Sequence, residues 1–173
     1  MGGKPKVKSI ARLTVAVSAT CVGATLVLSS FATAQSLEDL GTLMPDNSGG
    51  SAATAVSADG GVVVGSAAYA PFKLHPTNPP YLQYATHAFR WTESGGMIGL
   101  GTLELDNSGF SGATAVSADG GVVVGFATST VLGFRAFRWT ESGGMTDLGT
   151  LRSDNSGDSR ATATNVDGGV VVG

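Results

Sequence analysis

The side chains that could perform chemistry in this 173-residue sequence recur at repeated positions and form no unique cluster. Its two histidines, His75 and His87, have no further histidine or carboxylate at metal-ligand spacing, so we expect surface or turn histidines. A glycosidase needs carboxylates at unrepeated positions that converge with arginines on one face. Most of the Asp and Glu residues here, with Arg90 and Arg138, return at equivalent repeat positions. The sequence thus predicts no catalytic, cofactor or metal site, and a protein that is not an enzyme.

Three aspartates each stand directly before two glycines, at Asp59, Asp119 and Asp167. An Asp carboxylate can accept backbone N–H groups across its own turn, and glycine supplies positive φ, so we expect structural turns. The first two, each with a serine two residues earlier, resemble the Asp-box turn of several propellers, with valine in place of its aromatic residue. The alternative is calcium binding that adds nearby Asp-Asn-Ser oxygens, although no segment has EF-hand spacing.

Two tryptophans, Trp91 and Trp139, could stack against sugars. Each follows a phenylalanine by two residues, which is the alternation of a half-buried strand, so we expect both in a sheet core. The intervening arginines alternate to the opposite face, where we expect them solvated or paired with a nearby glutamate. The expected pairs are Arg90 with Glu93 and Arg138 with Glu141.

Residues 66–86 hold an insertion, because His87 follows Gly65 by 22 residues whereas Arg135 follows Gly125 by 10. Within it, the proline- and tyrosine-rich run at 69–84 predicts an extended loop and not another strand. Aromatic loops on a rigid scaffold often carry recognition, so this segment is the candidate binding element. The alternative is a tolerated insertion without a role. The candidate contacts are Tyr69, Phe72, Tyr81 and Tyr84.

Internal repeats define the strands and turns that carry these residues. Asp-Asn-Ser-Gly begins at residues 46, 106 and 154, and Asp-Gly-Gly follows each copy at the same offset. Ala-Phe-Arg-Trp-Thr-Glu-Ser-Gly-Gly-Met occupies 88–97 and 136–145, and Leu-Gly-Thr-Leu occupies 40–43, 100–103 and 148–151. The units span about 37–99, 100–147 and 148–173, the last being shorter.

Each full unit divides into four short strands. In the second unit, a strand at 113–118 and one at 122–124 flank an Asp-Gly hairpin turn, and strands follow around 137–139 and 145–151. One more strand is expected at 37–43. Four strands in about 48 residues match a propeller blade. We predict an all-β chain of antiparallel four-stranded blade-like repeats in a partial, unclosed β-propeller, with a β-solenoid as the alternative.

The composition supports a β fold, since 26 glycines and 13% charged residues disfavour a helical domain. At the N-terminus, three lysines and Arg12 precede an apolar stretch and an Ala-Thr-Ala cleavage pattern, which predicts a signal peptide at residues 1–34. That segment would engage a membrane during export. An uncleaved membrane anchor is the alternative, and Cys21 lacks a lipoprotein context.

Removal of residues 1–34 leaves 6 basic and 13 acidic residues, a net charge of −7. Such a chain repels phosphate backbones, so we expect no nucleic-acid partner. It also contains no cysteine, which suits an oxidising compartment. We expect a secreted or cell-surface location, with a periplasmic or N-terminally anchored protein as the alternative.

Several blocks carry a resemblance to a known family. They are His87-Ala88-Phe89-Arg90-Trp91-Thr92, Gly96-Met97, Leu100-Gly101-Thr102-Leu103 and the run from Ala115 to Gly125. Together they resemble the HAF repeats of bacterial extracellular proteins over nearly all of residues 35–173, and the second copy differs in having Arg135 for His87. The resemblance implies an exported propeller-like repeat protein, sometimes an autotransporter passenger, with no characterised activity and no cofactor.

Two functions remain open at this point. The first is a non-enzymatic adhesion or interaction module, or a fragment of one, whose partner would be a glycan or protein on a host or neighbouring cell. The second is part of a propeller-type glycan-processing enzyme. Because propellers close with four to eight blades, two full units and a shorter third predict a piece of a longer array. Its open sheet edges would allow self-association.

Overall fold

A computed structural model describes residues 9–12, 15–20, 27–32, 36–72, 83–129 and 133–173. The chain divides into an N-terminal unit, Met1–Leu40, and a repeat region, Gly41–Gly173. In the N-terminal unit, β1 (Ser9–Arg12) pairs with β4 (Ser36–Asp39) and β2 (Val15–Thr20) pairs with β3 (Val27–Ala32), both antiparallel. The described residues include no helix of the length and apolarity that a membrane crossing requires.

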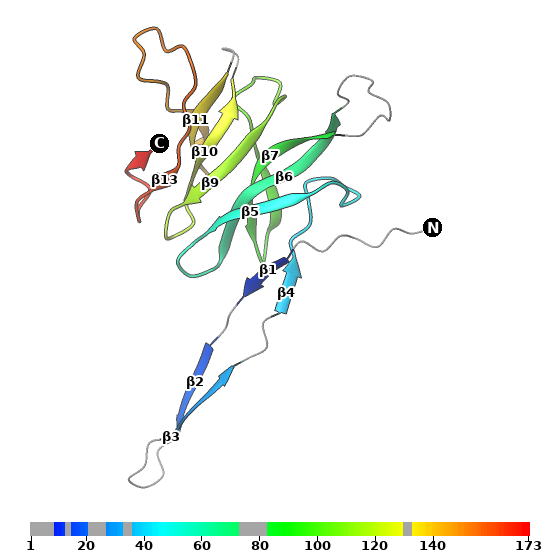
Figure 1. The fold of residues 1–173 in the computed structure, drawn as a ribbon, viewed down its shortest axis with the longest axis vertical. Helices are drawn as coiled ribbons and strands as arrows, with labels where there is room; N and C mark the ends of the chain where they lie inside the picture. Colours follow the sequence, from blue (N-terminus) through cyan, green and yellow to red (C-terminus); the bar gives the residue numbers. More distant parts are fainter. Residues whose placement is uncertain (1–8, 13–14, 21–26, 33–35, 73–82, 130–132) are drawn as a thin grey trace. The chain divides into compact units, whose positions relative to one another are not determined.

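The repeat region is built from antiparallel sheets, shown in Figure 1. The first sheet has the order β5 (Ser51–Val56), β6 (Val62–Phe72), β7 (Gln83–Thr92) and β8 (Gly96–Gly101). The second has the order β9 (Ser111–Val116), β10 (Val122–Thr128), β11 (Phe134–Thr140) and β12 (Gly144–Asp147). The third consists of β13 (Ala163–Thr164) and β14 (Val171–Val172). The all-β prediction is confirmed, with two four-stranded sheets and a two-stranded one.

Each four-stranded sheet contains a glycine in the middle of its second strand. A Cβ added at Gly65 would lie 2.0 Å from the Ala52 carbonyl oxygen, and one at Gly125 would lie 2.0 Å from that of Gly112. The pairing register of both sheets shifts at these points, which marks β-bulges. Glycine is therefore required here, because the neighbouring backbone leaves no room for a side chain.

The core lies between consecutive sheets. Val62 and Val64 of the first sheet pack in one cluster with Val123, Phe137 and Trp139 of the second. The opposite face of the second sheet carries Val122, Val124 and Ala136, which pack with Ala161 of the third repeat. The three-valine run therefore buries side chains on both faces of the second sheet, as is typical of a sheet covered on both sides. Trp139 is buried in this core, whereas Trp91 is half-buried.

Two expected strands end earlier in the structure. The strand expected at 37–43 is observed at Ser36–Asp39, and the one expected at 145–151 is β12, which ends at Asp147. Each Leu-Gly-Thr-Leu block instead enters a loop, because its glycine takes a positive φ: +77° at Gly41, +80° at Gly101 and +73° at Gly149. Positive φ interrupts a strand.

Candidate functional site

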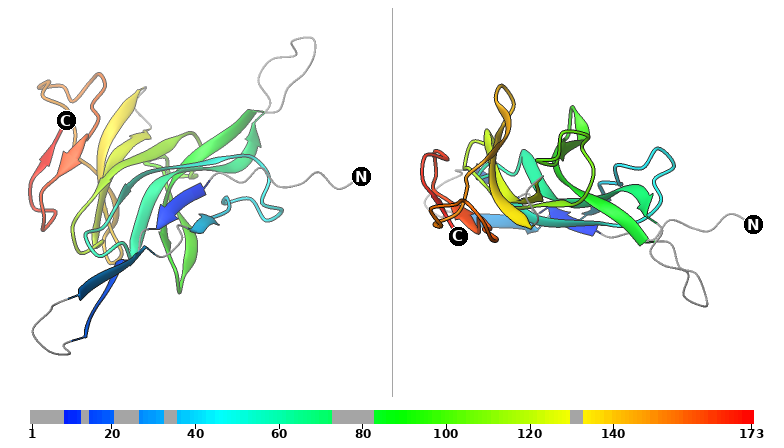
Figure 2. Two further views of the ribbon diagram at one scale, coloured as in Figure 1. Left: turned by 60° about the horizontal axis from the view of Figure 1, so that its bottom comes forward. Right: turned by 90° about the horizontal axis from the view of Figure 1, so that it is seen from above.

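The hairpin of β6 and β7 is the feature that distinguishes the first sheet from the second. β6 has 11 residues and β7 has 10, whereas β10 and β11 have 7 each. The pairing continues to Phe72 and Gln83, so the hairpin projects past the other strands of its sheet (Figures 1 and 2). The expectation of an extended loop over residues 69–84, within the 66–86 insertion, is therefore wrong at its two ends, because β6 reaches Phe72 and β7 begins at Gln83. Residues 68–72 extend β6 because they pair with residues 83–86 of β7.

Tyr69 lies on this projecting hairpin, at a bulge between Ala68 and Ala70. Its side chain is 43% exposed, and its ring stacks on His87 at a centroid distance of 4.0 Å and an interplanar angle of 14°. One aromatic face is therefore held by the scaffold while much of the side chain meets solvent. Pro71 pairs with Tyr84 in the strand register, beside Phe72. Tyr81 lies outside the described residues, as do the side chains of Phe72 and Tyr84.

His87 is buried, with 1% of its surface exposed, so its assignment as a surface or turn histidine is wrong. It lies on β7, paired with Ala67, and the stacked Tyr69 covers it. Burial lowers the pKa of His87 below its ordinary value of 6.5, because the apolar surroundings disfavour the charged imidazolium. Its Nε2 has no hydrogen-bond partner among the described residues. His75 lies outside that part of the chain.

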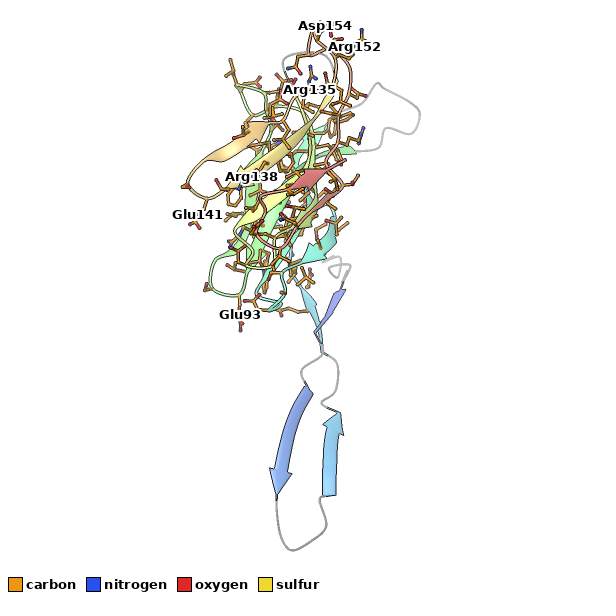
Figure 3. The ribbon with its side chains drawn as sticks, turned by 90° about the vertical axis from the view of Figure 1, so that its left-hand side faces the viewer. Glu93, Arg135, Arg138, Glu141, Arg152 and Asp154 are labelled. Carbon is orange, nitrogen blue, oxygen red and sulfur yellow. The ribbon has the colours of Figure 1, made fainter. Side chains whose placement is uncertain are left out.

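Arg135 takes the place of His87 in the second sheet and is also buried (Figure 3). Its Nη2 donates a hydrogen bond to the Asn155 carbonyl, while Nε and Nη1 find no partner in the described part of the chain. Nearby, Arg160 lies over the rings of Phe126 and Phe134, at 4.5 Å and 4.3 Å from their centroids. This cluster was not predicted from the sequence. Its signal was the pair of phenylalanines at positions where the first repeat has serine and threonine.

The three turn aspartates hold their own turns. The Gly61, Gly121 and Gly169 amides donate to Asp59, Asp119 and Asp167 at 2.8, 2.9 and 2.9 Å. Ser117 Oγ also donates to Asp119 at 2.5 Å, and this bond, with that from Gly121, lowers the pKa of Asp119. In the third repeat Asn165 replaces the serine, and its Oδ1 still accepts the Val170 amide at 2.8 Å.

The Asp-Asn-Ser segments, the calcium alternative, form closed loops of their own. The Thr42, Thr102 and Thr150 amides donate to Oδ1 of Asn47, Asn107 and Asn155 at 2.7–2.8 Å. The aspartates Asp46, Asp106 and Asp154 each accept the amide of the serine two residues later at 3.0 Å. These serine bonds lower the pKa of all three carboxyls. Within the described residues, no three His, Cys, Asp or Glu side chains gather as metal ligands.

Two arginines and two serines make hydrogen bonds between repeats. The arginines were expected in solvent or beside Glu93 and Glu141, and no partner was predicted for the serines. Arg90 and Arg138 each donate from Nε to the next repeat's turn, at Gly120 (3.2 Å) and Gly168 (3.3 Å), so both bridge neighbouring repeats. Arg138 is labelled in Figure 3. Ser111 and Ser159 accept the amides of Ala88 and Ala136 from the preceding repeat at 2.8 and 2.9 Å. Recurrence of serine at one repeat position, 111 and 159, was the available signal.

Comparison of the chain with protein-family models, with curated proteins and with solved structures finds no match in any of the three. The resemblance to HAF repeats, the signal peptide and the extracellular location remain predictions from sequence motifs.

Proposed function

We propose that this chain is an exported, non-enzymatic repeat protein that acts as an interaction or adhesion module, secreted or at the bacterial cell surface. The observation that carries the proposal is the projecting β6–β7 hairpin, which presents the 43% exposed Tyr69 on a ring stacked against buried His87. An aromatic ring held in this way loses little conformational freedom when a partner binds. Exposed aromatic residues on a rigid scaffold are typical of recognition sites.

The polar residues that recur in the repeats support a scaffold role. The aspartates of the turns and loops accept backbone amides, and Arg90 and Arg138 donate to the next repeat. These groups already have partners within the fold. The β6–β7 hairpin, in contrast, is longer than the β10–β11 hairpin of the second repeat. A glycan or a protein on a host or neighbouring cell is the partner class that fits an acidic exported chain with an exposed tyrosine.

For the fold, we propose that the sheets are blade-like units of an open propeller-type array. Support comes from the contacts of β9, which lies against β5 of the preceding sheet and against β13 of the following one. Consecutive first strands therefore neighbour one another, as the inner strands of propeller blades do. A scattering profile of the purified chain tests this arrangement, because a β-solenoid of the same length is more elongated.

The binding role is tested on a glycan array and on intact bacterial and host cells. Tyr69→Ser introduces the residue type that the second repeat has at the same position, Ser129, and we expect it to weaken binding at least about tenfold. Tyr69→Phe keeps the ring and should bind within about threefold of the parent chain. Leu105→Ala is the control, since Leu105 is 99% exposed on a loop of the second repeat. Equal binding by the Tyr69→Ser chain contradicts the proposal, and turnover of a glycoside would favour the enzyme alternative.

A further inference from the structure

The contact between consecutive repeats, here called the joint, is made twice with the same atoms. Its donor half is a threonine hydroxyl and a turn amide of one repeat, and its acceptor half is two carbonyls of the next. In the first joint, Thr54 Oγ1 donates to the Ala113 carbonyl at 2.7 Å and the Ala58 amide donates to the Ala118 carbonyl at 3.0 Å.

The second joint repeats this pattern one unit later. Thr114 Oγ1 donates to the Ala161 carbonyl at 2.7 Å, and the Ala118 amide donates to the Val166 carbonyl at 2.9 Å. The agreement within 0.1 Å shows that the two halves are complementary and do not depend on one particular pair of repeats. Ala118 takes part in both joints, as acceptor in the first and donor in the second.

A valine of the donor half meets a glycine of the acceptor half in both joints. A Cβ added at Gly120 would lie 2.3 Å from Val62 Cγ2, and one at Gly168 would lie 2.4 Å from Val122 Cγ2. Both valines are only 7% exposed. Glycine at this turn position therefore lets the next repeat cover the valine of the repeat before it.

The third repeat presents a donor half that is uncovered in the structure. Thr162, Val166 and Val170 stand where the second repeat has Thr114, Ala118 and Val122. Val166 is 75% exposed and Val170 is 57% exposed, in contrast to 7% for Val122. The Thr162 hydroxyl makes only the bond to the Val172 carbonyl within its own repeat, at 3.2 Å, among the interactions of the described residues.

The first repeat presents an uncovered acceptor half. Its strand β5 exposes Ala53, whereas the equivalent Ala113 on β9 is 3% exposed. Ala58 is also exposed, and no atom lies within 4 Å of a Cβ added at Gly60. The carbonyls of Ala53 and Ala58, with Gly60, correspond to the acceptor atoms and the glycine that the second repeat uses.

We propose that a second copy of this chain occupies the open donor half, so that copies associate head to tail through the joint. Val170 of one copy then packs on Gly60 of the next, and Thr162 and the Val166 amide donate to the Ala53 and Ala58 carbonyls. This interface is heterologous, which produces a ring or an extended series of chains and not a twofold dimer. It does not involve the β6–β7 hairpin and is independent of the partner binding proposed above.

Sedimentation velocity of the full chain, from about 0.01 to about 1 mM, tests the proposal in the range expected for a small interface. We expect the mean sedimentation coefficient to rise with concentration. Gly60→Asn should abolish this rise, because asparagine tolerates the φ of +74° and has open space within the chain but would collide with Val170 of the partner copy. Gly96→Asn is the matched control, since Gly96 has a φ of +66°, equally open space and a position outside the joint.

Val170→Asp disrupts the donor half, because it places a charge where a buried valine is needed. The Val170→Asp chain should therefore also stay monomeric. Leu105→Asp, at a side chain that is 99% exposed, should associate like the parent chain. The decisive sample mixes the Gly60→Asn and Val170→Asp chains. Each keeps one intact half, so the mixture should form a 1:1 dimer that grows no further. A parent chain that stays monomeric throughout, a Gly60→Asn chain that associates like the parent, or a mixture that stays monomeric overturns the proposal.

Discussion

One buried position on the third strand of each full sheet holds His87 in the first and Arg135 in the second. The two side chains have different neighbours. His87 stacks under Tyr69, whereas Arg135 donates to the Asn155 carbonyl of the loop that enters the third repeat. The position is therefore tied in one case to the projecting hairpin and in the other to the next repeat, although the surrounding sequence blocks are nearly identical.

Protonation of His87 should destabilise the fold. Its pKa is lowered by burial, so the folded state binds a proton less readily than the unfolded state, whose value is near 6.5. Above pH 6.5 the histidine is neutral in both states and the fold keeps its full stability. As the pH falls from 6.5 toward the folded-state pKa, the unfolded state gains a proton first and the free energy of unfolding decreases. We expect the free energy of unfolding in urea to decrease between about pH 7 and pH 5, beyond any change due to carboxyl groups.

His87→Phe keeps a ring beside Tyr69 and cannot titrate, so its unfolding free energy should change less over the same pH interval. His75→Gln removes the other histidine of the sequence and serves as the control that retains the parent pH dependence. If the parent and His87→Phe chains show the same pH profile, burial does not control the protonation of His87.

At the scale of elements, each Leu-Gly-Thr-Leu block leads into a loop that an asparagine closes. Asn47, Asn107 and Asn155 have φ values of 56°, 57° and 52°, and their side chains accept the threonine amide five residues earlier. The left-handed backbone explains why asparagine suits this place, since it tolerates positive φ better than other residues with a side chain.

Substitution of Asn107 separates the two contributions. Asn107→Gly keeps the positive φ and loses the bond from the Thr102 amide, which should cost about 0.5–1 kcal/mol at this exposed site. Asn107→Ala loses the bond and strains the backbone, so it should cost about 1–2 kcal/mol more than the glycine variant. Urea denaturation measures both, with Leu105→Ala in the same loop as a control expected to change stability by less than about 0.5 kcal/mol. Equal costs for both variants would contradict a role for positive φ.

At the scale of the whole repeat region, stability depends on coupling between neighbouring repeats, as in other repeat proteins. The third repeat contributes only β13 and β14 as strands among the described residues, yet Ala161 is buried against the second sheet. The joint therefore links sheets of four, four and two strands that share no strand pairing. Disruption of the joint should lower the stability of the whole region.

Two equivalent glycines measure this coupling. Gly60 and Gly120 have φ values of +74° and +73°, so alanine at either should cost about 1–2 kcal/mol in backbone strain. Alanine at Gly120 would also clash with Val62 across the joint, and we expect an additional loss of about 1–3 kcal/mol. Denaturation at a dilute concentration, where copies do not associate, compares the two variants. If the Gly120→Ala chain is as stable as the Gly60→Ala chain, the contact between Gly120 and Val62 does not contribute to stability and the prediction is wrong.

Local patterns in the sequence were sufficient to predict the hairpins. Period-two alternation, Asp-Gly turns and valine runs involve residues a few positions apart, so all-β architecture, four strands per full unit and the aspartate turns follow from them. The same reasoning wrongly extended strands into the Leu-Gly-Thr-Leu blocks. Apolar leucines favour a strand, while the competing loop depends on an asparagine hydrogen bond that periodicity does not reveal.

Which polar side chains join the repeats, and which candidate contacts reach solvent, depends on the packing of the sheets. Thr54 and Ala113 are 59 residues apart, and Arg90 and Gly120 are 30 apart, so their meeting depends on how one sheet packs on the next. The same packing buries His87 and leaves Tyr69 partly exposed. The repeated strand-and-turn units follow from the sequence alone, because their contacts are local. The joint between units and its uncovered halves were decided by packing, because sheet-to-sheet contacts join residues that no local pattern connects.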